Sequence, residues 1–155
     1  MRLEYINPFA EAAYETLGTY LKDDIRISDV TLREGVTEIS GLAIVIGISG
    51  QASGNVLLDM SEEVACKVGS AMNETPCVNV GPPVINAIKE LANMVSALAV
   101  TKISKIGYDL NVSPPVVVQG HQITYQSFKN ESLLVRLDIA NVGPMDIFVA
   151  IVEQA

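Results

Sequence analysis

Residues 82–106 read PPVINAIKELANMVSALAVTKISKI, and this stretch decides the fold because it is the longest helical pattern in the chain. Its two leading prolines fit the first helical positions, where a missing backbone N–H costs no hydrogen bond. Gly107 supplies the stop. Apolar residues fall within roughly 140° of the helix circumference, and this arc predicts the buried face: Ile85, Ile88, Leu91, Ala92, Val95, Leu98, Ala99 and Ile103.

The opposite side of this helix carries Asn86, Glu90, Asn93 and Ala97, with Lys89 at the edge of the stripe. Because Glu90 and Asn93 are one turn apart, their side chains can project together as a fork. An amide can hold a water in line with a phosphorus atom, and a nearby carboxylate can pair with a cation of a partner. Ordinary solvated surface has the same spacing, so spacing alone leaves both interpretations open.

The remaining sequence predicts an α+β domain with a mainly antiparallel sheet, two long helices packed on it and pseudo-symmetric halves. One domain covers 1–155. Asn7 and Pro8 are interpreted as the N-cap and first residue of the first helix. The other expected elements are a helix over 9–21, strands over 25–34, 42–48 and 55–60, a helix capped by Ser61 and reaching 72, and strands at 116–118, 122–128, 133–140 and 146–152, with turns at Asn130-Glu131 and 141–144.

Composition excludes several classes of function. The net charge of -8 and the small number of Lys and Arg, 10 in all, argue against nucleic acid and anionic membrane partners. No stretch is predicted to span a bilayer, and the N-terminus lacks a signal-peptide pattern, so we expect a cytoplasmic protein. His121 is the single histidine, so no metal site is expected.

The segment NAIKELANMVSA, residues 86–97, resembles the signature helix of the CheC, CheX and FliY chemotaxis phosphatases, which centres on E-x-x-N. The run ELANM is close to the E-L-G-N-M typical of that family. The similarity extends to the N-terminal helix, to the apolar strand IVIGISG at 44–50 and to SPPVVVQG at 113–120.

The resemblance implies hydrolysis of the phosphoaspartate of a CheY-like response regulator. Asn93 would position the attacking water, and Glu90 would dock the regulator's active-site lysine. The protein would need no cofactor of its own, because Mg²⁺ belongs to the regulator. Asn86, Lys89, Met94 and Ala97 would contact this partner.

Two positions depart from the family pattern, which usually has Ser or Asp at position 86 and Gly at position 97. Ala97 adds a methyl group where the partner's backbone approaches. The first helix lacks a second E-x-x-N, so the chain has one such motif. In this respect it resembles the CheX branch of the family, whose members are homodimers. Residues 116–118 are a candidate pairing edge, with an internal strand as the alternative. A non-catalytic receiver-binding or flagellar-switch-like module is the alternative function.

Overall fold

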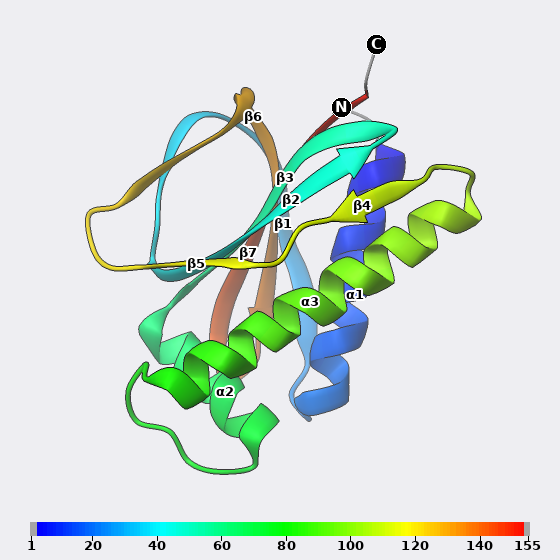
Figure 1. Cartoon of the computed structure of the whole chain (residues 1–155). Coiled ribbons are helices and arrows are strands. Elements are labelled where there is room, and N and C mark those ends of the chain that lie inside the picture. Colours follow the sequence, from blue (N-terminus) through cyan, green and yellow to red (C-terminus); the bar gives the residue numbers. More distant parts are fainter. Residues whose placement is uncertain (1–2, 154–155) are drawn as a thin grey trace.

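The computed structural model describes residues 3–153, apart from the side chains of 127–130. It confirms the α+β class and the mainly antiparallel sheet (Figure 1). In chain order the elements are α1 (Leu3–Tyr20), β1 (Ile25–Glu38), β2 (Gly41–Gly50), β3 (Ala52–Ser61), α2 (Glu62–Asn73), α3 (Pro82–Lys105), β4 (Leu110–Val112), β5 (Val116–Gln119), β6 (Thr124–Ile139) and β7 (Gly143–Glu153).

The strands form one sheet in the order β1-β6-β7-β3-β2-β4, with β5 also pairing β2. This order is symmetric about the central pair of β3 and β7. Each half of the chain gives its first strand to the other half, because β1 pairs with β6 whereas β4 and β5 pair with β2. The expected pseudo-symmetric halves are therefore present, and they exchange strands.

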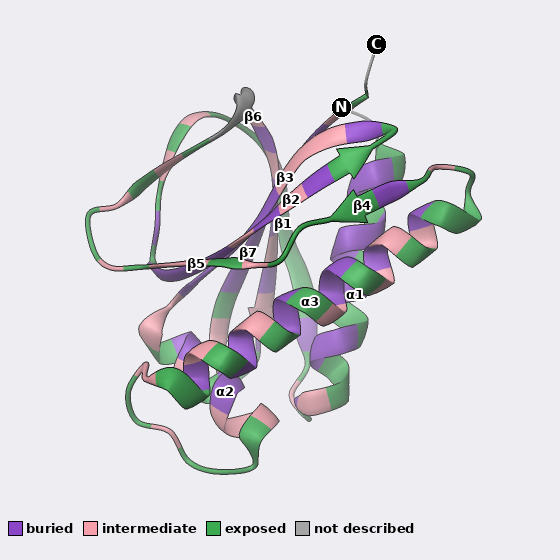
Figure 2. Cartoon of the chain, viewed as in Figure 1, coloured by how far each residue is buried: buried purple, intermediate pink, exposed green. Residues whose placement is uncertain are grey.

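The helices cover one face of the sheet (Figures 1 and 2). Alternate residues of the central strands point to this face, and they pack with the apolar sides of all three helices in the main core. On the opposite face a smaller cluster joins Ala43, Leu57 and Phe148 to Val118 and Ile123. The sheet therefore curls over this second cluster. On the other face of the sheet, α3 has one side packed on the main core and its opposite side exposed to solvent.

The first helix begins earlier than the sequence predicts. Asn7 and Pro8 lie inside α1 and do not form its start. Tyr5 and Ile6 are almost fully buried, at 1% and 2% exposure. Their packing extends the helix on the N-terminal side of the expected cap at Asn7. The free energy gained by this burial offsets the loss of the backbone hydrogen bond that a proline inside a helix removes.

The turn expected at Asn130-Glu131 is wrong, because the runs on either side of it belong to the single strand β6. Glu34 of β1 pairs with Glu131 and Val36 pairs with Gln126, so the register of the two strands shifts between these pairs. The sequence signal therefore marks an irregularity in the pairing of β1 with β6, and β6 continues through it. The irregularity expected near the start of β1 is also present, between Ile27 and Asp29.

One helix among residues 3–153, α3, has the length and hydropathy of a membrane span, contrary to the sequence-based expectation. Its apolar residues face the main core, where Ile88, Leu91, Ala99 and Ile103 are fully buried. Burial against α1, α2 and the sheet accounts for this hydropathy.

Asp59 of β3 is a buried carboxylate on the sheet face away from the helices, at 2% exposure. It accepts hydrogen bonds from the backbone N–H of Ser40 at 3.0 Å and from its hydroxyl at 2.9 Å. Burial raises the pKa of Asp59 above its usual range despite these bonds, and the charge of Asp146 adds to the rise. Asp146 itself is held by Arg136, with Nε and Nη2 at 2.7 and 2.8 Å.

We therefore expect Asp59 to make folding stability fall as the pH rises from the ordinary carboxyl pKa to the raised folded-state pKa. In that range the folded state binds more protons than the unfolded state, so raising the pH favours unfolding. The Asp59→Asn variant lacks this titration. Urea unfolding between pH 4 and 7 should show the wild type losing stability relative to Asp59→Asn as the pH rises, and a constant difference would contradict the prediction.

Candidate functional site

The stripe predicted on α3 is exposed in the structure. Asn86, Glu90, Asn93 and Ala97 all face solvent, whereas Lys89 is half-buried. The buried face agrees with the prediction at Ile88, Leu91, Ala92, Val95, Ala99 and Ile103.

The buried face is broader than predicted: at about 100° per residue, Ala87 and Ser96 lie just beyond the two ends of the predicted arc and Val84 lies inside it. Ile85 and Leu98 are only half-buried, whereas Val84, Ala87 and Ser96 are buried. The Ser96 hydroxyl donates to the carbonyl of Ala92, so its burial leaves no unpaired donor. The greater width is consistent with the packing of α3 against α1 and α2 as well as against the sheet.

Glu90 and Asn93 have their polar atoms available. Neither side chain makes a hydrogen bond or ion pair with any part of the chain that the structure describes. They extend from the middle of a long, well-anchored helix, which fixes their backbone. A carboxylate and an amide on adjacent turns can therefore engage a partner without first breaking internal bonds.

Met94 is partly engaged within the protein, unlike Asn93 beside it. The Tyr20 hydroxyl at the end of α1 donates to Met94 Sδ at 3.4 Å. This contact ties the C-terminus of α1 to the turn of α3 that carries Asn93. Sequence spacing gave no indication of Tyr20, because the contact joins residues far apart in the chain.

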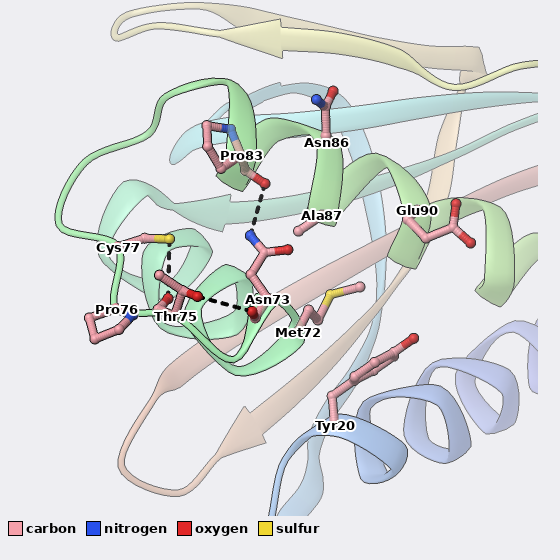
Figure 3. Close-up of a pocket in the computed structure, with 10 residues that line it drawn as sticks. All are labelled: Tyr20, Met72, Asn73, Thr75, Pro76, Cys77, Pro83, Asn86, Ala87 and Glu90. Atoms are coloured by element: carbon pink, nitrogen blue, oxygen red, sulfur yellow. Dashed lines mark hydrogen bonds between the residues drawn. The ribbon is translucent and has the colours of Figure 1, made fainter.

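Two hollows flank the stripe. The first, the α2–α3 hollow, has a volume of about 590 Å³ and includes Asn86 and Glu90 in its lining (Figure 3). Its other lining residues are Tyr20, Met72, Asn73, Thr75, Pro76, Cys77, Pro83 and Ala87. The second, the α1–α3 hollow, has a volume of about 500 Å³ and is lined by Glu15, Thr16, Thr19, Met94, Ala97, Leu98 and Thr101.

A metal centre has no support in the described part of the chain, since no group of three or more His, Cys, Asp or Glu is gathered there. His121 Nε2 lies 3.7 Å from Oε1 of Glu62.

The chain has the features of the CheC- and CheX-like class: a curled antiparallel sheet, helices on one face of it and an exposed E-x-x-N fork. The model of the family described as "Chemotaxis phosphatase CheX" matches residues 42–136, and the chain belongs to this family.

Known relatives resemble the protein over most of its length. The CheY-P phosphatase CheX of Thermotoga maritima is 29% identical over 129 residues, which is 83% of either chain. The crystal structure of CheX from Desulfovibrio desulfuricans is 20% identical, with a TM-score of 0.85 over 97% of this chain and 99% of that one. In the CheX-CheY-BeF3-Mg²⁺ complex from Borrelia burgdorferi, the matching chain is 23% identical, with a TM-score of 0.80 over 98% of this chain and 100% of that one.

Proposed function

We propose that the protein is a phosphatase that hydrolyses the phosphoaspartate of a CheY-like response regulator. The observation that carries this proposal is the exposed, unpartnered pair Glu90 and Asn93 on α3 in a chain of the CheX family. The Thermotoga relative is named a CheY-P phosphatase, and the Borrelia complex pairs a CheX with CheY. Both names support the choice of a receiver domain as substrate.

In this proposal Asn93 positions the nucleophile. Its side-chain carbonyl accepts a hydrogen bond from a water, and its amide group donates to the phosphoryl region, so the water oxygen lies in line with phosphorus. The new P–O bond forms as the bond to the aspartyl oxygen breaks, giving inorganic phosphate and a free aspartate. Phosphoryl transfer depends chiefly on positioning and charge neutralisation, so a neutral amide is sufficient.

Glu90 has the docking role. Its carboxylate pairs with the active-site lysine of the regulator and fixes the register of the two proteins. Asn86, Lys89, Met94 and Ala97 complete the contact surface along the same face of α3. Mg²⁺ is supplied by the regulator and neutralises charge on the phosphoryl oxygens. Because such regulators act in the cytoplasm, we propose that this protein acts there too.

The test is the decay of phosphorylated receiver domains from the source organism, with Mg²⁺ and with or without the protein. We expect faster phosphate release for at least one receiver. The second candidate is a non-catalytic receiver-binding module, which Ala97 favours because it replaces the usual glycine. Binding to a receiver without any faster release would establish that alternative.

We also propose that the protein is a homodimer that pairs through β1. Both β1 and the β4–β5 side lie at sheet edges, so the expected edge at 116–118 is one of two candidates. β1 is the longer of the two, and it exposes Ile27, Val30, Leu32 and Val36, each at least half exposed. An apolar edge strand of this length is a template for pairing with a second chain.

Leu32→Lys is therefore expected to give a monomer, because it places a charge in the middle of the β1 edge. The matched control is Val116→Lys, which puts the same charge on the β5 edge and should leave the dimer intact. Sedimentation equilibrium at micromolar concentration measures both. A monomeric wild type would contradict the dimer, and dissociation by Val116→Lys alone would move the interface to β5.

A further inference from the structure

The α2–α3 hollow is continuous with the proposed catalytic stripe, because Asn86 and Glu90 belong to both. Along a helix that rises about 1.5 Å per residue, Asn86 and Asn93 are about 10 Å apart. Any receiver whose phosphoaspartate reaches Asn93 and whose lysine reaches Glu90 must therefore place neighbouring surface over this hollow.

The walls of the hollow are built from internal hydrogen bonds. Asn73 Nδ2 donates to the carbonyl of Pro83 at 3.1 Å and ties the end of α2 to the start of α3 (Figure 3). Ser70 Oγ accepts from the backbone N–H of Cys77 at 2.9 Å and donates to the carbonyl of Cys66 at 2.7 Å. The backbone N–H of Thr75 donates to the carbonyl of Ser70 at 3.2 Å. The α2–α3 loop is thus held against α2, and the concave shape exists before any partner arrives.

The lining has an apolar floor and a single charge. Tyr20, Met72, Pro76 and Ala87 supply much of the apolar surface, and Asn73, Thr75 and Asn86 lie among them as neutral polar groups. Glu90 is the only charged residue among the ten that line the hollow, and none of these residues is a cation that could neutralise it. The complementary occupant therefore presents an apolar side chain beside a basic one.

We propose that the α2–α3 hollow is a specificity pocket that accepts an apolar side chain of the receiver domain, next to the lysine that pairs with Glu90. This assignment rests on the proposed phosphatase function and adds to it the part of the interface that selects the regulator. Burial of one such side chain stabilises the complex without touching the phosphoryl group. The pocket therefore acts on affinity and leaves the chemical step to Asn93.

The first test uses the two cysteines of the native chain as probes. Cys77 lines the hollow and is half-buried, whereas Cys66 is half-buried on α2 and is not among the lining residues. Each thiol is alkylated with a neutral maleimide, with and without saturating BeF3-activated receiver, and followed by peptide mass spectrometry. Each rate is compared with its own rate without receiver, because burial raises the pKa of the Cys66 thiol and slows its reaction. We expect protection of Cys77 by about tenfold or more and an unchanged rate for Cys66.

The second test fills the pocket. Thr75→Trp places a large side chain in the hollow, and Val78→Trp makes a similar change in the same loop at a residue that is 92% exposed and outside the lining. We expect Thr75→Trp to weaken binding of the BeF3-activated receiver by about tenfold or more, with Val78→Trp equal to the wild type. If Cys77 stays unprotected, or if both tryptophan variants bind like the wild type, the pocket assignment is overturned while the phosphatase proposal stands. A wild type that neither binds nor dephosphorylates any receiver overturns the proposed function itself.

Discussion

Asn93→Ala is expected to lower the kcat for receiver dephosphorylation by about 10²–10³, because it removes a preorganised group that acts on the attacking water. Binding of the BeF3-activated receiver should remain close to the wild-type value, since Glu90 and the rest of the face are intact. Stability should not fall, because Asn93 is exposed, makes no internal bond among the described residues and is replaced by a better helix former. The measurement is stopped-flow decay of phosphorylated receiver under single-turnover conditions.

The matched comparison is Asn86→Ala, the same chemical change about two turns earlier on the stripe. Asn86 belongs to the proposed contact surface and lies away from the reacting atoms, so its loss should appear in KM and leave kcat near the wild-type value. Equal kcat values for Asn93→Ala and the wild type would remove the catalytic role from Asn93. A loss of kcat in both variants would mean that the stripe acts as one unit.

Gly54→Ala is expected to destabilise the fold by about 3 kcal/mol or more, because the new methyl group has no room. A Cβ at Gly54 would lie 1.8 Å from the carbonyl oxygen of Ala150 on the adjacent strand β7, and the φ of +152° is one that L side chains rarely adopt. The obstacle is backbone in the centre of the sheet, so neither partner can move aside cheaply.

Gly18→Ala is the control, with the opposite sign. Gly18 lies inside α1, is exposed, and a Cβ there would meet nothing within 4 Å. Alanine should therefore stabilise the protein by up to about 1 kcal/mol through helix propensity and a smaller unfolded-state entropy. Urea unfolding of both variants measures the difference, and unchanged stability of Gly54→Ala would contradict the steric argument.

Local chemistry predicts those elements whose ends are set by local bonds. Ser61 caps α2 as expected, accepting from the N–H of Val64 at 3.1 Å. The turn near residue 51 joins β2 and β3 in the expected hairpin. The sequence-based prediction failed where contacts with distant residues set the ends of an element. The burial of Tyr5 extends α1 at its N-terminus, and pairing with β1 keeps β6 extended across a sequence rich in turn residues.

The candidate site likewise has one part that is predictable from local sequence and one part that depends on the packed fold. The exposed stripe with Glu90 and Asn93 follows from helical periodicity alone, so its geometry was predictable from one segment. Tyr20, Met72 and Cys77 come from α1, α2 and the connecting loop, and only the packed fold brings them beside Glu90. The site residues implied by the resemblance to the CheX phosphatases all lie on α3, so they include Asn86 and Glu90 but none of the residues that α1, α2 and the connecting loop add to the hollow.

The exchange of first strands between the two halves has a consequence for biosynthesis. Ile25 at the start of β1 pairs with Ile139 near the end of β6, so β1 leaves the ribosome long before its partner strand has been made. At roughly 5–20 residues per second of synthesis, β1 waits for several seconds with its backbone N–H and C=O groups unpaired. Neither half can complete its own sheet, so we expect the sheet to become protease-resistant only after β6 has been translated. The long-range pairing also makes this a slow-folding topology.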